Sequence, residues 1–193
     1  MGGGCSASVD VHTSAWAQDP SSRNKHIRIV FVGLDGGGKS SIWNRIQGLI
    51  QDGEHVFEHV PLCEPTCNVR RRDLSYNGKK LVLIDTPGKF WLRSTWIEEV
   101  QNSNCVVYVI DSSDRMRLQL AKDELFALQT QVLDFKERKV IVLLTKADHP
   151  NAISKSCIQK EVDFSEIYAK ILSFSARKNK DVKSLLDRCI GVL

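Results

Sequence analysis

Residues 33–40 read GLDGGGKS, and they directly follow the apolar run IRIVFV at residues 27–32. This is the spacing of the phosphate-binding loop G-x-x-x-x-G-K-[ST], which lies between a strand and the start of a helix. Glycines let backbone N–H groups approach an anion, and the helix predicted over residues 40–50 points the positive end of its dipole at the same anion. A glycine-rich turn without a ligand is the alternative. The strand before the loop and the helix after it favour a nucleotide phosphate site.

The chain has 193 residues and the composition of an ordinary globular protein, with 42% hydrophobic and 26% charged residues and a net charge of +4. The length favours one domain, which we expect at residues 25–193. Six cysteines occur without a C-x-x-C pair, so we expect no disulfide framework and a reducing, cytoplasmic compartment. Cys105 and Cys189 fall in apolar segments and are predicted to be buried thiols. No apolar run reaches the length of a membrane span, and no secretory signal is present.

The N-terminus reads MGGGCS and fits the N-myristoylation pattern M-G-x-x-x-[ST]. We expect a myristoyl chain on Gly2, and Cys5 is a candidate for a second, palmitoyl chain. Two acyl chains hold a protein on a membrane far better than one. A flexible start without lipid is the alternative. Residues 1–24 are therefore predicted to be a disordered, lipidated arm that makes the protein peripheral on membranes.

The rest of the chain alternates predicted strands and helices, which is typical of an α/β fold with a mostly parallel sheet. Asn77-Gly78 lies between two strand-like segments, at residues 67–76 and 79–84, and predicts an antiparallel hairpin. Other predicted elements are buried strands at residues 105–110, 139–144 and 167–174, a helix from about Asp114, and a closing amphipathic helix that buries Val182, Leu185, Leu186 and Cys189.

Polar residues that suit Mg²⁺ and a terminal phosphate follow the loop in sequence order. Lys39 would reach the β- and γ-phosphates, and the Ser40 hydroxyl would bind Mg²⁺. Asp85 ends a strand and begins DTPG, where a carboxylate would anchor the metal from its second shell. Thr66 would complete the metal shell, and the Gly88 N–H would contact the γ-phosphate. The alternatives are an ordinary polar turn for DTPG and an ordinary strand-entry threonine.

Two later segments suit a guanine base. Thr145, Lys146, Ala147 and Asp148 follow a predicted strand, and the Asp148 carboxylate can accept hydrogen bonds from guanine N1–H and the N2 amine. Lys146 would lie against the base. After the last strand, the Ala176 N–H of Ser-Ala-Arg can point at guanine O6. A short polar loop is the alternative for each segment. The candidate nucleotide-binding residues are Gly33, Asp35, Gly36, Gly37, Gly38, Lys39, Ser40, Ser41, Thr66, Gly88, Thr145, Lys146, Asp148, Ser175, Ala176 and Arg177.

The order of these five motifs resembles the Ras-like GTPases, and the chain resembles the Arf/Arl family specifically. The resembling stretches are GLDGGGKSS (33–41), Pro65-Thr66, Tyr76-Asn77-Gly78, DTPG (85–88), Trp96 and VIDSSDRMRL (109–118). The resemblance implies a Ras-like P-loop GTPase fold: a six-stranded, mostly parallel sheet with one antiparallel edge hairpin and helices on both faces.

The same resemblance implies a function. It implies a monomeric switch that binds GTP or GDP with Mg²⁺ at Ser40, Thr66 and Asp85, and a nucleotide-dependent register shift of the hairpin at residues 67–84. The implied partners are effector, exchange and activating proteins and a membrane surface, in trafficking or signalling, with no nucleic acid expected.

Some residues depart from the family pattern. Lys89 stands where the family usually has the glutamine that orients the attacking water, and an ammonium cannot accept a hydrogen bond from water. We therefore expect slow hydrolysis, with Lys39, Gly88 and Lys89 as the candidate catalytic residues. Thr145 replaces the usual asparagine of the guanine motif. Val69, Ile84 and Glu99 stand at the family's aromatic effector triad, which puts the usual effectors in doubt.

Three other functions are alternatives to an Arf-like switch. They are a nonhydrolysing GTP-binding scaffold, a ribosome-assembly GTPase that TKAD and SFSARK loosely resemble, and a P-loop kinase of small metabolites. We expect the hairpin to have a solvated, basic edge formed by Arg70–Arg72 and Lys79-Lys80. Contact of these residues with anionic lipid or an acidic partner is the alternative. A metal site at His55, His59, Cys63 and Cys67 is disfavoured because Pro61 interrupts the helix it would need.

Overall fold

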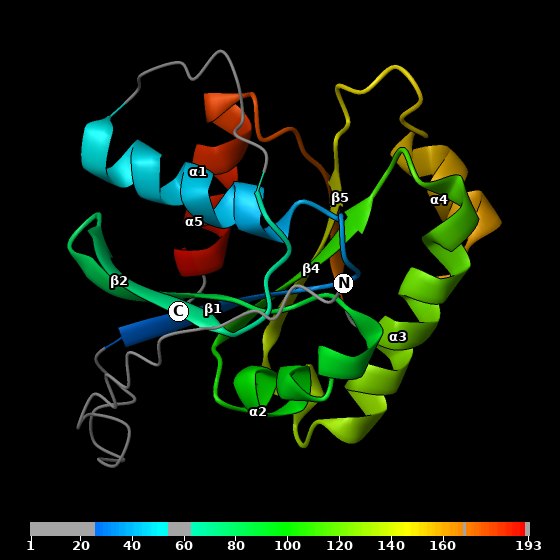
Figure 1. Ribbon diagram of the computed structural model, residues 1–193, viewed down its shortest axis with the longest axis horizontal. Coiled ribbons are helices and arrows are strands. Elements are labelled where there is room, and N and C mark those ends of the chain that lie inside the picture. Colours follow the sequence, from blue (N-terminus) through cyan, green and yellow to red (C-terminus); the bar gives the residue numbers. More distant parts are fainter. Residues whose placement is uncertain (1–25, 54–62, 168, 192–193) are drawn as a thin grey trace, which may run out of the picture.

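A computed structural model describes residues 26–53, 63–167 and 169–191 of the chain. Their strands form one six-stranded sheet in the order β2-β3-β1-β4-β5-β6, in which only β2 and β3 pair antiparallel. The predicted fold class is confirmed (Figure 1). The strands are β1 (His26–Val32), β2 (Arg70–Tyr76), β3 (Lys79–Asp85), β4 (Cys105–Asp111), β5 (Lys139–Thr145) and β6 (Lys170–Ser173).

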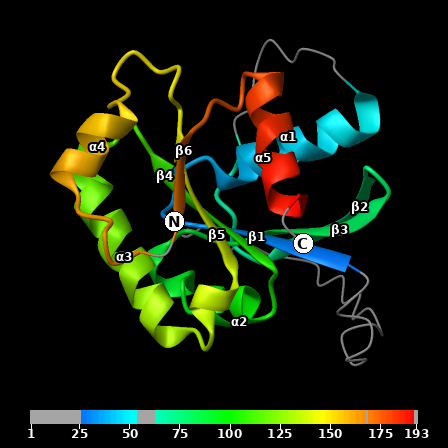
Figure 2. The ribbon, with the colours of Figure 1, turned by 180° about the vertical axis from the view of Figure 1, so that it is seen from behind.

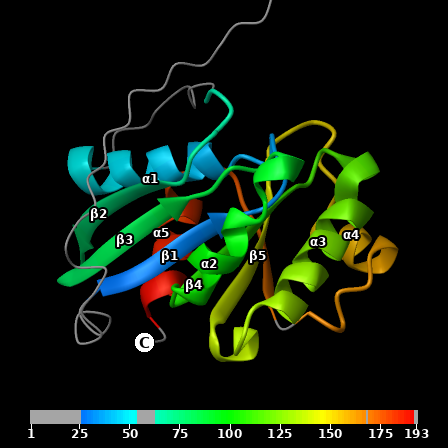
Figure 3. The same ribbon diagram turned by 60° about the horizontal axis from the view of Figure 1, so that its bottom comes forward.

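Helices cover both faces of the sheet, as predicted. Helices α1 (Lys39–Asp52) and α5 (Asn179–Ile190) pack side by side over one face, which Figure 2 shows from behind. Helices α2 (Thr95–Gln101), α3 (Leu118–Gln131) and α4 (Lys155–Glu161) cover the other face (Figure 3). Successive residues of β1 alternate between the two cores, with Phe31 on the α1 face and Val30 on the α3 face. This alternation is the period of two that an extended strand imposes.

The hairpin turn forms where the sequence predicts it, with positive φ at Asn77 (49°) and Gly78 (73°). Its first strand was predicted to begin at residue 67, and this is wrong, because β2 begins at Arg70. The reason is the length of the partner strand: β3 ends at Asp85, which pairs with Arg70, so earlier residues have no ladder partner.

The last strand also begins later than predicted, at Lys170 instead of residue 167. Ile167 is buried, but it is part of a turn in which its N–H donates to the Phe164 carbonyl. Its apolar character therefore reflects packing against the core and not strand pairing. Helix α3 follows a 3-10 turn at Arg115–Arg117 and so starts a few residues after the predicted position near Asp114.

The predicted burial of the closing helix is confirmed at Val182, Leu185, Leu186 and Cys189. Cys105 and Cys189 are both buried, as predicted, and the five cysteines within the described residues are free thiols. Among the described helices, none is long and apolar enough to cross a bilayer. The predicted arm at residues 1–24, with Gly2 and Cys5, lies outside the described residues, as do His55 and His59.

The parallel strands place their carboxyl ends along one edge of the sheet. Strand β1 leads into the GLDGGGKS loop, β3 ends at Asp85, and β5 ends at Thr145. In open α/β sheets, ligands bind outside this edge. The motifs separated along the chain therefore come together at one place.

Candidate functional site

The loop at residues 33–40 has the backbone that its glycines permit. Gly33 (φ 137°), Gly36 (φ 72°) and Gly38 (φ 95°) all have positive φ, which residues with a Cβ adopt only with strain. A Cβ on Gly33 would also overlap the backbone carbonyl of Val109 in β4. Gly38 is the N-cap of α1, so the loop ends at a helix N-terminus that favours an anion.

Lys39 is buried beneath this loop. Its Nζ donates hydrogen bonds to the carbonyls of Gly33 and Leu34, each at 2.8 Å. Burial lowers the pKa of Lys39 to about 8, and the nearby carboxylates of Asp85 and Asp35 oppose part of that effect. The ammonium is thus already positioned at the loop and is only weakly compensated by negative charge. Phosphate oxygens would supply that charge.

The three side chains predicted for the Mg²⁺ site meet at one point. The Ser40 hydroxyl lies 2.8 Å from both Thr66 Oγ1 and Asp85 Oδ2, and Thr66 Oγ1 lies 3.3 Å from Asp85 Oδ2. Asp85 is fully buried, and its Oδ1 has no hydrogen-bond partner among the described residues. Two hydroxyls lie beside a buried carboxylate whose Oδ1 is available to accept a hydrogen bond. Such a set of oxygen donors suits Mg²⁺ and its bound waters.

Gly88 packs directly against the loop, since a Cβ there would overlap the Asp35 backbone and the Lys39 ammonium. Gly88 and Lys89 line a cavity of about 380 Å³ together with Lys39, Ser40 and Thr66. The Lys89 Nζ lies 5.5 Å from the centre of the Trp91 ring. This wall of the cavity is therefore cationic where the family pattern has a neutral glutamine.

A second cavity of about 180 Å³ adjoins the first and shares Gly38, Ser41 and Lys146 with it. Its remaining walls include Thr145, Asp148, Ala176 and Arg177, the residues predicted for the base. The phosphate and base segments therefore line one continuous cleft.

The base segments are linked to the phosphate loop and to each other. Thr145 Oγ1 lies 2.7 Å from the Gly37 carbonyl oxygen, which ties the end of β5 to the loop. Burial raises the pKa of Asp148, but hydrogen bonding to Ser175 and the charge of Arg177 outweigh it and bring the pKa below its ordinary value. The Arg177 Nε is 3.5 Å from Asp148 Oδ2. A guanine donor pair would compete with Arg177 for that carboxylate.

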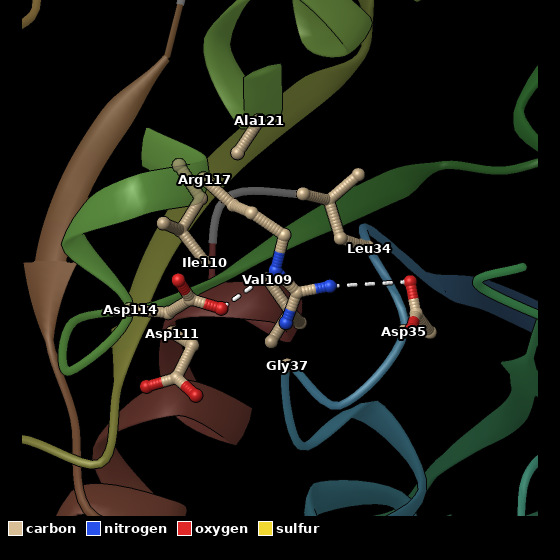
Figure 4. Close-up of a pocket in the computed structure, with 9 residues that line it drawn as sticks. All are labelled: Leu34, Asp35, Gly37, Val109, Ile110, Asp111, Asp114, Arg117 and Ala121. Atoms are coloured by element: carbon tan, nitrogen blue, oxygen red, sulfur yellow. Dashed lines mark hydrogen bonds and ion pairs between the residues drawn. The ribbon is translucent and has the colours of Figure 1, made fainter. Parts of the chain in front are cut away.

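Asp35 is bridged to elements outside the cleft. Figure 4 shows Arg117 between Asp35 and Asp114, at 3.3 Å and 2.6 Å. The cavity drawn there has a volume of about 10 Å³, which is too small for a nucleotide. On the other side, Arg93 donates to the Gly88 carbonyl at 3.0 Å and to Glu124 at 2.7 Å. These arginines link the phosphate loop to α3 and to the DTPG loop.

Three of the residues predicted for nucleotide binding do not line the cleft, and Asp85, predicted for the metal site, does not line it either. Gly33 and Gly37 approach β4, and Ser175 is fully buried, with its N–H donating to Asp181 at 2.9 Å. All three act on the shape of the loops. The remaining predicted residues of the nucleotide set line one of the two cavities.

Sequence reasoning missed two arginines. Arg70 and Arg71 were read as a solvated edge, but Arg70 pairs with Asp85 at 2.5 Å, and Arg71 pairs with the buried carboxylate of Glu99. A signal for the first pair was available: counting back from the Asn77-Gly78 turn in antiparallel register places Arg70 opposite Asp85. Trp43, which stacks on Arg70, had no comparable signal.

Comparisons with known proteins show the family of the chain. Residues 14–192 match the model of the ADP-ribosylation factor family. The chain is 31% identical over 173 residues to ADP-ribosylation factor-like protein 1 of Saccharomyces cerevisiae, covering 88% of this chain and 89% of that protein. It is 32% identical over 149 residues to ADP-ribosylation factor-like protein 2 of Drosophila melanogaster, covering 75% of this chain and 73% of that protein.

A solved structure shows the same fold. The Arl6 BBS3 small GTPase from Trypanosoma brucei, with the bound nucleotide analogue GppNp, superposes with a TM-score of 0.70 at 19% identity, over 85% of this chain and 95% of that one. This likeness supports the Ras-like fold, and the family match extends over most of the chain. The protein belongs to the ADP-ribosylation factor family of small GTPases.

Proposed function

We propose that the protein is a guanine-nucleotide switch that binds GTP and GDP with Mg²⁺. The observation that supports this best is the continuous cleft, in which Lys39, Ser40 and Thr66 line one end and Asp148 lines the other. The cleft thus combines a site for phosphate and a hard cation with a site for a base that donates two hydrogen bonds. GTP and GDP satisfy both ends at once.

Each end has defined roles in this proposal. Lys39 and the backbone N–H groups of the loop bind the β- and γ-phosphates, and the Gly88 N–H contacts the γ-phosphate. Ser40 and Thr66 would bind Mg²⁺, with Asp85 accepting hydrogen bonds from its waters. When bound, the metal neutralises phosphate charge. Asp148 accepts from guanine, Lys146 lies against the base, and Thr145 holds the base segment to the loop.

Hydrolysis in this protein is proposed to be slow. Lys89 lines the phosphate cavity, and its ammonium has donors only, so it cannot accept a hydrogen bond from the attacking water. Lys39 and backbone donors remain to stabilise charge on the γ-phosphate as water attacks in line. A nonhydrolysing GTP-binding scaffold is the second candidate, and the same residue favours it. Single-turnover hydrolysis with and without cell extract separates the two, because a scaffold hydrolyses GTP in neither condition.

The N-terminal pattern supports a proposal for location. Acyl chains on Gly2 and Cys5 would make the protein peripheral on membranes, with its cleft presented to effectors, exchange factors and activating proteins in trafficking or signalling. Intact-mass spectrometry of the protein from its own cells tests this. The expected masses include a myristoyl group, and an unmodified Gly2 would contradict the proposal.

Calorimetry tests the nucleotide proposal directly. The folded protein with magnesium is titrated with GTP, GDP and ATP. We expect saturable binding of GTP and GDP and far weaker binding of ATP, because adenine lacks the donor pair that Asp148 accepts. Binding of no guanine nucleotide would refute the proposal, and equal binding of ATP would refute the role of Asp148. Nucleotide analysis of the purified protein adds a check, since retained GTP supports slow hydrolysis and retained GDP contradicts it.

A further inference from the structure

Arg70, at the first position of β2, occupies the magnesium anchor. Its Nη2 and Nε lie 2.5 Å and 3.2 Å from Oδ2 of Asp85. The same carboxylate oxygen is contacted by the hydroxyls of Ser40 and Thr66. A guanidinium therefore already lies at the oxygen where the two predicted metal ligands meet.

The position of Arg70 is defined by more than its charge. Its guanidinium lies 4.8 Å from the centre of the Trp43 ring of α1, and the Trp43 indole N–H donates to the Leu83 carbonyl of β3. Arg70 is also opposite Asp85 in the β2–β3 ladder. Stacking on an aromatic ring and pairing with a carboxylate together limit the rotamers of this long side chain.

We propose that Arg70 is a built-in cation of the magnesium site, which makes retention of guanine nucleotide only weakly dependent on Mg²⁺. The inference rests on the proposed guanine-nucleotide function. Asp85 supplies one negative charge, and Arg70 neutralises it before any metal binds. A second cation beside the guanidinium is then bound less tightly, because the two positive charges repel each other and share one carboxylate.

This arrangement weakens the binding of Mg²⁺ but does not prevent it. Asp85 Oδ1 has no hydrogen-bond partner among the described residues, so it remains able to accept from a metal-bound water. Because Arg70 cancels the charge of Asp85, removal of Mg²⁺ leaves no uncompensated carboxylate at the anchor to repel the phosphates, and Lys39 stays in place to bind them. The nucleotide is therefore held partly by charges that chelation cannot remove.

The neighbouring Arg72 provides a matched control. It is in the same strand and is exposed, and the ion pair and ring stacking of Arg70 have no counterpart at Arg72 among the described contacts. Arg72→Met removes the same charge by the same substitution, away from Asp85. Arg70→Met removes the guanidinium at the anchor, and Arg70→Lys keeps a charge there without the planar fork.

The experiment measures release of GDP bearing a fluorescent N-methylanthraniloyl group, from chelator alone to millimolar Mg²⁺. We expect chelation to speed release from the unaltered protein by less than about threefold, and from Arg70→Met by more than about thirtyfold, a tenfold difference that corresponds to about 1.4 kcal/mol. The Mg²⁺ concentration that half-maximally slows release falls about tenfold in Arg70→Met. Arg72→Met matches the unaltered protein, and Arg70→Lys is intermediate.

Two results would overturn the inference. One is an unaltered protein whose release accelerates about a hundredfold on chelation, which needs no variant and so is independent of any folding defect. The other is a folded Arg70→Met protein with unchanged Mg²⁺ dependence. In both cases the proposed function stands, because nucleotide is bound. If neither protein binds the labelled GDP, the proposed function is wrong and the inference falls with it.

Discussion

The phosphate end and the base end of the cleft are built in different ways. The phosphate end is built around one loop, which contributes residues 35–36 and 38–41 with one buried lysine, and residues 63–66, 88–89 and 146 complete the cavity wall. The base end combines residues of three segments that are far apart in sequence: Gly38, then Thr145, Lys146 and Asp148, then Ala176 and Arg177. Only the order of the strands brings these segments together.

This difference predicts how each end responds to change. The phosphate end depends on local geometry and on charge, so damage there affects every nucleotide. The base end depends on hydrogen-bond pattern, so damage there affects the choice of nucleotide. A Thr145 hydroxyl at 2.7 Å from the Gly37 carbonyl oxygen links the two ends.

The largest expected effect is at the phosphate end. Lys39→Ala removes the buried ammonium, and we expect affinity for both GTP and GDP to fall about a thousandfold, since two charge-assisted hydrogen bonds contribute about 4 kcal/mol. Calorimetry measures both affinities. Lys80→Ala, at an exposed lysine of β3, is the matched control and should bind normally. Loss of GTP binding alone would contradict a role at phosphates common to both nucleotides.

The base end should respond with a change of preference. Asp148→Asn places an amide opposite the guanine donors, and we expect GTP affinity to fall about a hundredfold, from about 3 kcal/mol of lost charge-assisted hydrogen bonds. Affinity for ATP, measured in the same competition assay, should stay as it was. An equal loss for both nucleotides would mean that Asp148 supports the fold of the cleft and does not select the base.

Substitutions of Lys89 test how the cavity wall next to the proposed γ-phosphate position affects hydrolysis. Lys89→Gln restores a group that can accept from water, and we expect single-turnover GTP hydrolysis to rise about tenfold, which is about 1.4 kcal/mol of barrier. Lys89→Met serves as the control, since it removes the ammonium and supplies no acceptor. A rise of the same size in Lys89→Met would show that the positive charge, and not the missing acceptor, slows the reaction.

The smallest effect is expected at the link between the two ends. Thr145→Val keeps the shape and removes the hydroxyl, so the Gly37 carbonyl loses its partner, at a cost of about 1 kcal/mol. We expect release of fluorescent GDP to speed up about fivefold, with no change in the preference for guanine. Unchanged release with an unchanged melting temperature would show that the ends act independently.

Local elements were predictable because their signals are local. The loop at residues 33–40 and the Asn77-Gly78 turn require particular φ values, and both have them in the structure. Element starts were less predictable: residues 67–69 read as strand, yet β3 ends at Asp85 and offers them no partner. Ile167 read as strand because it is apolar, and burial alone does not distinguish a strand from a packed turn.

The chain order of the motifs was sufficient to predict the family and most of the residues that line the two cavities, because glycine spacing, turn chemistry and strand periodicity all act over a few residues. The tertiary structure decided the partners of Arg70 and Arg71, which are identical residues side by side in sequence. As neighbours on a strand they face opposite sides, so one pairs with Asp85 beside Trp43 and the other with Glu99. A buried carboxylate attracts whichever cation the fold brings within reach, and that depends on the register and packing of distant segments.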